Sequence, residues 1–222
     1  MAQPLYKFLP RRFGEALVEH GNIRITTLYT CRRIEDAGIG RSDPLEHTKQ
    51  KQMSFDRVMA TPENYDEIDP FLRGFMARPT EGRVMYELGT FRREFDGPDL
   101  FVYCTSLYRS RRMERRFDSG DDVWVEIFNP TGFFSEVTKS LSDVAVFSRE
   151  GAVRYRSRTF HPHDEAASMD AALLKDPEFE PEHEWRLLWE PRTRPIDPVM
   201  RVITELTRYC RISRDVLARA KC

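Results

Sequence analysis

The chain has 222 residues, 40% hydrophobic and 12% aromatic, which is enough to build the hydrophobic core of one large domain. Its 35 basic and 36 acidic residues nearly cancel, so no overall charge favours nucleic acid or a membrane surface as a partner. No stretch approaches the length of an apolar membrane span, and the N-terminus lacks a signal-peptide core. The sequence therefore predicts a cytoplasmic protein folded as one domain over residues 1–222.

Cysteine and histidine positions give no metal-binding pattern. The four cysteines lie far apart, without a Cys-x-x-Cys pair: Cys31, Cys104, Cys210 and Cys222. This spacing argues against both a zinc site and a disulfide framework. His161 and His163 could share one face of an extended segment, but no third ligand accompanies them. We therefore expect no bound metal.

The first part of the chain predicts strand, helix, strand. Residues 5–9 form a short apolar strand, and Phe13, Ala16 and Leu17 follow at helical spacing before Gly21 ends the helix. Residues 22–29 are β-branched and alternating, which favours a second strand. The polar, glycine-punctuated segment 31–44 is then predicted to be a loop near a ligand.

The middle of the chain is harder to interpret. Within residues 46–98 only 53–59 and 83–88 are candidate strands, whereas 101–106 is a dense apolar run typical of a buried central strand. Five arginines follow on a predicted helix: Arg109, Arg111, Arg112, Arg115 and Arg116. These arginines could hold phosphates, but in a chain whose overall charge is near zero a solvated helix face is favoured. We therefore expect no specific binding to nucleic acid.

The last part predicts several strands with helices inserted. Residues 123–128 form a strand, and Asn129 and Pro130 begin a helix. Residues 144–148 and 152–158 are predicted to form a hairpin around 149–151. Helices are predicted over 164–175 and 199–210. The order indicates an α+β fold with mixed or antiparallel sheets and helices packed on them.

A charged strand near the C-terminus is the strongest candidate for a site. In residues 184–190, Trp185, Leu187 and Trp189 alternate with Glu184, Arg186 and the apolar exception Leu188, so they are predicted to face the core. Three charged side chains then fall on the opposite face: Glu182, Glu184 and Arg186. That face is either a reactive site or a solvated surface with a cross-strand ion pair.

Four short motifs, taken in chain order, resemble two known groups of proteins. The motifs are residues 6–8, residues 23–29, Cys104-Thr105-Ser106 and residues 182–186. They resemble bacterial and phage proteins of the domain-of-unknown-function family numbered 2971, over the first forty residues and roughly 101–189. The same order is similar to a diverged ADP-ribosyltransferase, which implies a split sheet and NAD as substrate.

The resemblance to ADP-ribosyltransferases also implies roles for individual residues. Glu184 would be the catalytic glutamate, with Glu182 beside it and Ser106 on the supporting strand with Thr105. Lys7 or Arg24 would hold the adenosine end. The remaining implied cofactor-binding residues are Thr27, Tyr29, Arg32, Arg33 and Arg186. Arginine forks suit the phosphates of NAD, and we expect Arg24, Arg32, Thr105, Ser106 and Glu184 to line one pocket.

The chemistry of these residues suits cleavage at a ribose. Breaking the bond between nicotinamide and ribose develops positive charge on the sugar, and a carboxylate stabilises that charge. A second carboxylate on the same face could activate an acceptor, and mutual repulsion would raise one of the two pKa values. Two alternatives stay open: a metal-dependent phosphoesterase or nuclease, and a non-enzymatic phage or bacterial regulator that binds a nucleotide or a protein partner.

Overall fold

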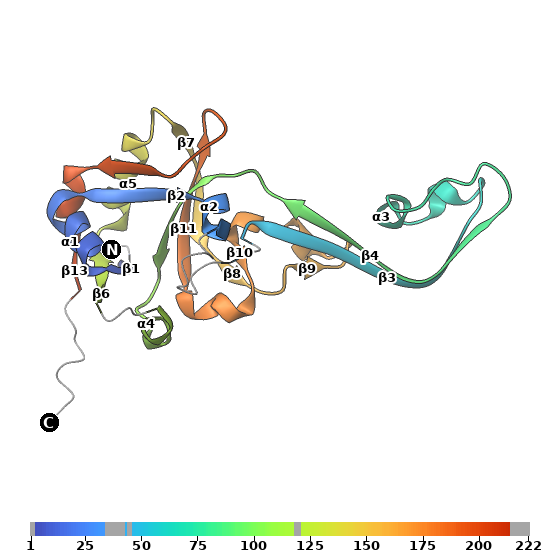
Figure 1. Cartoon of the computed structure of the whole chain (residues 1–222), viewed down its shortest axis with the longest axis horizontal. Helices are drawn as coiled ribbons and strands as arrows, with labels where there is room; N and C mark the ends of the chain where they lie inside the picture. The colour runs from blue at the N-terminus through green and yellow to red at the C-terminus, as the bar shows by residue number, and fades with distance from the viewer. Residues whose placement is uncertain (1–2, 34–42, 44–45, 118–120, 214–222) are drawn as a thin grey trace, which may run out of the picture.

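The computed structural model describes residues 3–33, 43, 46–117 and 121–213, and divides them visibly into a body and an arm (Figure 1). The body contains the main sheet, the longer helices and the N-terminus. The arm is a long two-stranded ribbon that extends from one side of the body. The chain is thus an α+β domain with mainly antiparallel sheets and few helices, as the element order predicts.

Eight strands form the main sheet. They are β1 (Leu5–Pro10), β2 (Asn22–Thr27), β5 (Phe101–Ser106), β6 (Asp122–Ile127), β7 (Ala145–Ala152), β11 (Glu184–Pro191), β12 (Val199–Val202) and β13 (Cys210–Ile212). The order is β12-β2-β5-β1-β6-β13, with β11 on β5 and β7 on β11, and each of these pairs is antiparallel.

The sheet forks at its central strand, β5. Strand β11 occupies one edge of β5 from Phe101 to Ser106. The other edge pairs with β2 at Phe101 and Val102 and with β1 at Ser106. Because a strand has only two edges, β1 and β2 must share the second one and separate between these contacts.

The helices vary in length, and two of them, α1 and α5, show a predicted end or start signal. They are α1 (Arg11–His20), α2 (Leu28–Arg33), α3 (Pro70–Arg73), α4 (Arg111–Phe117) and α5 (Pro130–Ser140). Gly21 ends α1 with φ of 70°, and an added Cβ would lie 1.9 Å from the carbonyl oxygen of Ile203, so only glycine fits. The Asn129 side chain accepts a hydrogen bond from the Gly132 N–H (3.1 Å), which confirms the predicted N-cap.

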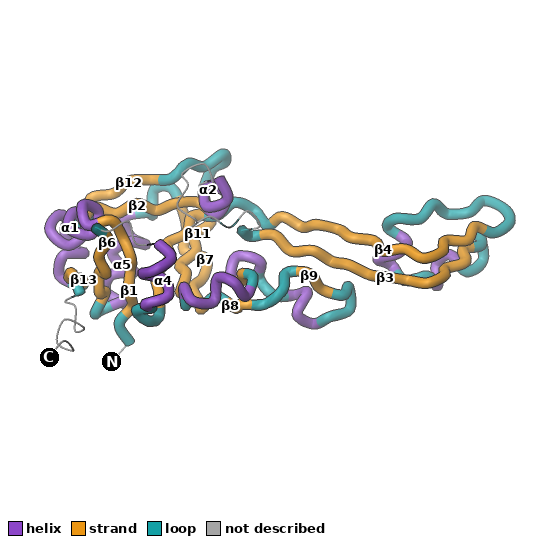
Figure 2. Tube along the Cα trace, turned by 60° about the horizontal axis from the view of Figure 1, so that its bottom comes forward, coloured by secondary structure: helices purple, strands orange, loops and turns teal. Residues whose placement is uncertain are grey.

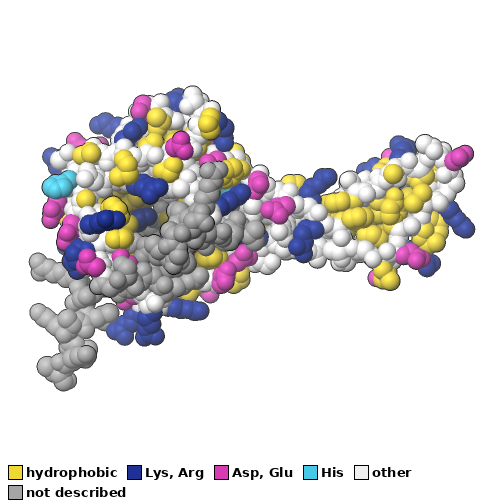
Figure 3. Space-filling view, viewed as in Figure 1, with side chains coloured by type: hydrophobic (Ala, Val, Ile, Leu, Met, Phe, Trp, Pro, Cys, Tyr) yellow, Lys and Arg dark blue, Asp and Glu magenta, His cyan; other side chains and the backbone are white. Residues whose placement is uncertain are grey.

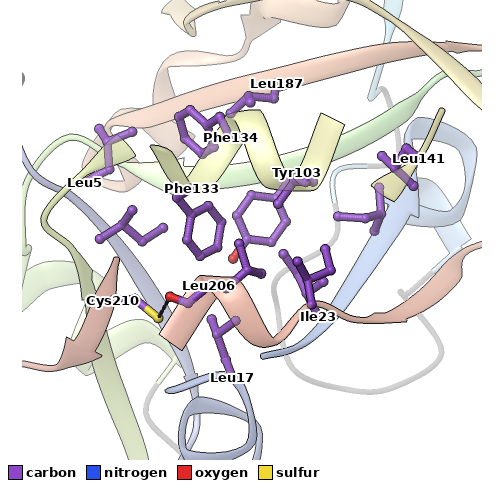
Figure 4. Packing of buried hydrophobic residues seen from close by; sticks show 14 of the residues in the cluster. Leu5, Leu17, Ile23, Tyr103, Phe133, Phe134, Leu141, Leu187, Leu206 and Cys210 are labelled. Atoms are coloured by element: carbon purple, nitrogen blue, oxygen red, sulfur yellow. Dashed lines mark hydrogen bonds between the residues drawn. The ribbon is translucent and has the colours of Figure 1, made fainter. Parts of the chain in front are cut away.

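The main core lies between one face of the sheet and helices α1 and α5 (Figure 4). Trp189 and Leu187 of β11 are fully buried in it, and Tyr103 packs against Phe133 with ring centroids 5.9 Å apart. Trp185 packs against the edge of the same core. The predicted alternation of β11 is therefore confirmed on its apolar side.

The opposite face of the sheet is covered by short elements. These are η4 (Ala171–Leu173), η5 (Pro177–Glu182), β8 (Arg154–Tyr155) and β10 (Leu174–Lys175). In contrast, η3 (Glu165–Ser168) packs in a separate cluster with Phe160 and Leu174, and η6 (Thr204–Arg208) lies on the main core. A small cluster of Leu28, Leu100, Val102, Ala172 and Leu188 is buried on this face. The side chains of Glu184 and Arg186 share the face, because they alternate with Leu187 and Trp189.

The arm consists of β3 (Thr48–Ala60) and β4 (Val84–Asp96), which pair along their full length. At its base, β9 (Thr159–Phe160) pairs in parallel with Gln50 and Lys51. At its far end, residues 61–83, including η2 (Tyr65–Glu67) and α3, fold back on the ribbon. Phe75 stacks on Phe91 at 4.6 Å, and Phe91 on Phe55 at 5.2 Å, so a small aromatic cluster holds the tip together.

Several predicted elements are wrong, because pairing in the sheet overrides local signals. No hairpin turns at 149–151: β7 runs through these residues, and Gly151 pairs with Arg186 of β11. Residues 199–210 form strands β12 and β13 with η6 between them, since β2 and β6 offer edges to pair with.

Three other predicted boundaries also differ. Residues 164–175 form the short helices η3 and η4 and strand β10 rather than one helix. The strand predicted over 22–29 ends at Thr27, and Leu28 begins α2. The predicted ligand loop 31–44 lies mostly outside the described residues, and its first three residues belong to α2.

Candidate functional site

A cavity of about 210 Å³ lies beside β1, β5 and β11, on the face that carries Glu184. It collects residues from distant parts of the chain. The lining residues are Tyr6, Lys7, Phe8, Leu9, Cys104, Thr105, Ser106, Met113, Lys175, Glu182 and Glu184. Five predicted site residues thus meet at one cavity: Lys7, Thr105, Ser106, Glu182 and Glu184.

Five ionisable side chains next to this cavity form a buried charge cluster: Glu46, Lys175, Glu182, Glu184 and Arg186. Arg186 is 1% exposed and Glu46 is 2% exposed, so this face of β11 is not the solvated surface that the sequence left open. Three carboxylates and two cations are therefore held out of water. Such an arrangement is stable only when nearly every charge has a close partner.

Arg186 stands at the centre of the cluster. Its Nη1 and Nη2 donate to the two carboxylate oxygens of Glu46 at 2.7 and 2.9 Å, which is a bidentate pair. Its Nε and Nη2 lie 2.8 and 2.7 Å from Glu184 Oε2, and Nη1 also donates to the Ala172 carbonyl. All three guanidinium nitrogens are thus in use within the protein.

Lys175 joins the other two carboxylates. Its Nζ donates to Glu182 Oε2 at 2.6 Å and to Glu184 Oε1 at 3.4 Å. Glu184 therefore lies between two cations, whereas Glu182 has one. The backbone positions Glu184 as well: its N–H donates to the hydroxyl of Tyr155 (2.7 Å), and its Cα is opposite Ser106 in the β5–β11 ladder.

The pKa values of the two cavity glutamates, Glu182 and Glu184, are shifted in opposite directions. Burial raises the pKa of Glu182 to about 7, and the neighbouring Glu184 adds to this increase while Lys175 opposes it. Burial would also raise the pKa of Glu184, but Arg186 and Lys175 outweigh it and lower the pKa to about 2. Near neutral pH the cavity therefore contains one fixed carboxylate and one that exchanges its proton.

The other cavity residues provide hydrogen-bonding groups and no activated nucleophile. Lys7 Nζ donates to the Cys104 carbonyl at 2.6 Å, and Thr105 Oγ1 donates to the Trp185 carbonyl at 3.1 Å. The Ser106 hydroxyl makes a weak contact with Met113 Sδ at 3.8 Å. Burial raises the pKa of the Cys104 thiol to about 11, so this thiol stays protonated at neutral pH.

The remaining predicted residues do not line the cavity. Arg24 is exposed on β2, and its Cα pairs with Met200 of β12. Thr27 Oγ1 accepts from the Thr30 N–H at 3.0 Å, a helix-capping contact at the start of α2. The expected pocket that includes Arg24 and Arg32 is therefore wrong in these two members.

Three of the predicted residues belong to α2 instead of a strand end: Tyr29, Arg32 and Arg33. The Tyr29 hydroxyl donates to the Gly97 carbonyl at 2.7 Å. Arg32 pairs with Asp96 at 2.8 Å and donates to the backbone carbonyl of Glu46. Arg32 thus helps to position the backbone of Glu46. The last predicted residue, Arg186, contacts Glu184 but does not line the cavity.

Sequence reasoning missed two members of the cluster, Glu46 and Lys175. Glu46 precedes a segment without clear periodicity and lies 140 residues from its partner Arg186. Lys175 was placed on a predicted helix, but it ends the two-residue strand β10. No spacing rule connects either residue to β11, because short 3₁₀ helices and bridges carry no sequence period.

The arginines of residues 109–116 and the histidine pair do not line the cavity. Arg111, Arg112 and Arg115 are exposed on or beside α4, and Arg109 lies 3.8 Å from Glu114. His163 pairs with Asp69 of the arm tip. Within the described part of the chain, no group of three or more His, Cys, Asp or Glu side chains is arranged to hold a metal ion.

None of the described helices is long and apolar enough to cross a bilayer. A second, larger cavity of about 520 Å³ lies on the other face of the sheet, between α5 and β11, and is mainly apolar.

Comparison of the chain with the models of known protein families, with curated proteins and with solved structures finds no match.

Proposed function

We propose that this cavity binds the nicotinamide–ribose part of NAD and that the chain breaks the bond between them, by ADP-ribosyl transfer or by hydrolysis. The observation that carries the proposal is the pair of cavity carboxylates with opposite pKa shifts, Glu182 and Glu184. Enzymes that act on glycosidic bonds use two carboxylates whose environments separate their roles in this way.

Glu184 is suited to stabilise positive charge on the ribose. Arg186 and Lys175 keep it ionised and fixed in direction, so no reorganisation is needed when the bond to nicotinamide breaks. The bonding electrons leave with nicotinamide, which departs as a neutral molecule. The oxocarbenium ion that remains is stabilised by the carboxylate more than the substrate is, because the sugar gains charge in the transition state.

Glu182 is suited to activate the acceptor. With a pKa near 7, part of the population is ionised at neutral pH and can take a proton from water or from an acceptor hydroxyl as its oxygen attacks the sugar carbon. Lys175, which donates to Glu182 at 2.6 Å, orients this carboxylate. The atoms balance: one C–N bond breaks, one C–O bond forms and one proton passes to Glu182.

The size of the cavity limits what it can hold. Pockets that enclose a whole cofactor measure about 300–1,000 Å³, and this cavity has about 210 Å³. Only one end of NAD would therefore enter, next to Lys7 and Ser106, and the phosphates would lie outside. The forked sheet around β5 supports the finer proposal of a split sheet similar to that of ADP-ribosyltransferases.

The test is release of nicotinamide from NAD by the wild type, Glu184→Gln and Glu190→Gln. Loss of the Glu184 charge should lower turnover by about a hundredfold or more, as for one electrostatic stabiliser in a preorganised site. Glu190 lies on the same strand, but it is exposed and accepts only from Ser148 Oγ (3.0 Å), so Glu190→Gln should keep wild-type turnover.

The structure changes one control in this test. Glu184 is only 12% exposed and pairs with two cations, so Glu184→Gln should also lower stability, and each assay must be run well below the measured melting temperature. A wild type that releases no nicotinamide and shows no NAD-dependent rise in melting temperature contradicts the proposal.

One observation favours the alternative of a regulator without turnover. Both oxygens of Glu184 already accept hydrogen bonds from Arg186 and Lys175. In a site that only binds a ligand, the charge cluster would hold the cavity in a fixed shape and take no part in a reaction. In that case NAD or another nucleotide raises the melting temperature of the wild type and of Glu184→Gln alike, and no nicotinamide appears.

A further inference from the structure

The arm presents a long free strand edge. Among the described residues β4 pairs only with β3, so its second edge, over Val84–Asp96, has no partner strand. Natural proteins usually shorten, cover or charge such an edge, because it can pair with another chain. Here the edge lies on a ribbon that extends away from the body (Figure 2), and most residues of β4 are exposed.

Exposed apolar side chains accompany this edge. Met85 is 49% exposed, Phe95 is 38% exposed and Leu88 is 83% exposed. Leu88 also has a positive φ of 41°, a conformation that leucine rarely adopts. The surface view shows apolar side chains gathered toward the end of the arm (Figure 3). An apolar edge of this kind marks a contact surface.

We propose that two copies of this chain associate by antiparallel pairing of their β4 edges, forming a continuous four-stranded sheet β3-β4-β4-β3 around a twofold axis. In full overlap the thirteen residues of β4 centre on Thr90, which then faces the same residue of the second copy. Glu87 falls opposite Arg93 twice, and Met85 falls opposite Phe95 twice. This register places no like charges opposite each other.

The corresponding self-pairing of the neighbouring strand β3 would bring like charges together. Full antiparallel overlap of two β3 strands would centre on Ser54 and place Lys51 opposite Arg57, which are like charges. In addition, β9 already occupies the outer edge of β3 at Gln50 and Lys51. The edge of β4 is therefore the self-complementary one, and charge complementarity selects a second copy as its partner.

The pairing also accounts for the exposure of Leu88. In this register Leu88 faces Arg92 of the second copy, whose aliphatic stem can cover the leucine. Leu88 lies two residues from Thr90, at the centre of the contact.

The first experiment measures mass by sedimentation velocity over a series of concentrations. The expected result is a reversible shift from the chain mass of 26.2 kDa to twice that value. Glu87→Arg and Arg93→Glu should each raise the dissociation constant by about tenfold, since two like-charge contacts replace two attractive ones. The double variant Glu87→Arg with Arg93→Glu should bind more tightly than either single variant, because it restores the attractive contacts between copies, but Glu87→Arg still removes the pair with Arg57 of the same chain. A monomer at every concentration, or a double variant no tighter than the single ones, overturns the proposal.

The second experiment tests the register directly. Thr90→Cys, made in a Cys222→Ser background, should form a disulfide between two copies under mild oxidation, because the two Cα atoms lie about 4.5–5.5 Å apart in a paired register. Ser54→Cys is the matched control, since Ser54 lies beside Thr90 on β3, with the hydroxyls 2.9 Å apart, but far from the axis. Equal cross-linking of the two variants contradicts β4 pairing.

Discussion

Two regions of this chain contain ion pairs of nearly equal length in opposite surroundings. In the body, Arg186 and Glu46 are 2.7 Å apart, with side chains 1% and 3% exposed. On the arm, Arg57 and Glu87 are 2.9 Å apart, with side chains 65% and 53% exposed. Water screens the second pair and not the first, so the distance between charges alone says little about their energetic weight.

The two regions are also held together in different ways. Removing one partner in the body leaves a charge in a medium that cannot solvate it, so the cluster behaves as a unit. A two-stranded ribbon is marginal on its own, and each exposed ion pair adds at most about 1 kcal/mol to its stability. The aromatic contacts of Phe55, Phe75 and Phe91 at its tip contribute more.

The largest effect is expected for Arg186→Met. This change leaves Glu46 and Glu184 buried without their main partner and should lower the free energy of unfolding by about 3–5 kcal/mol. Urea denaturation measures the difference. The double variant Arg186→Met with Glu46→Gln should recover part of the loss, because one uncompensated charge is removed. A loss below about 1 kcal/mol would show that water reaches the cluster.

An intermediate effect is expected from the proton on Glu182. Since the folded pKa is raised to about 7, the unfolded chain releases this proton first as the pH rises. The contribution of Glu182 to stability is therefore full below about pH 4.5 and is lost between there and about pH 7, by about 3 kcal/mol at most. Glu182→Gln should remove this slope from a series of urea titrations. An unchanged slope means that another group titrates.

Glu184 should act in the opposite direction. Its lowered pKa means that its contribution is present at neutral pH and is lost as the pH falls below about 4.5 toward 2. The two glutamates therefore affect different pH ranges, and the variants separate them.

The smallest effect is expected for Arg57→Met on the arm. Its pair with Glu87 is exposed, so the change should cost at most about 1 kcal/mol, and added salt should reduce even that difference. The same urea titration with and without salt measures both quantities. A loss comparable to that of Arg186→Met would mean that the arm is covered in solution and that the comparison with the body no longer holds.

Features that depend only on local geometry could be predicted from the sequence. The period of two along β11 correctly assigned Trp185, Leu187 and Trp189 to one face and Glu184 and Arg186 to the other, because successive side chains of any strand alternate. Gly21 and Asn129 correctly marked a helix end and a helix start, because a left-handed residue and a side-chain cap are properties of a few neighbouring residues.

The tertiary structure decided what covers each face. Nothing near Arg186 in sequence indicates that Glu46 pairs with it, or that Lys175 joins the same cluster through Glu184, because both residues reach this place only through the path of the chain. The same holds for the cavity, which includes Lys7, Ser106 and Glu182 and leaves Arg24 on an exposed strand. Local rules assign a side chain to one face of a strand, but its burial depends on contacts between distant segments. Because the charged side chains of β11 are buried, they form a candidate site and not a solvated surface.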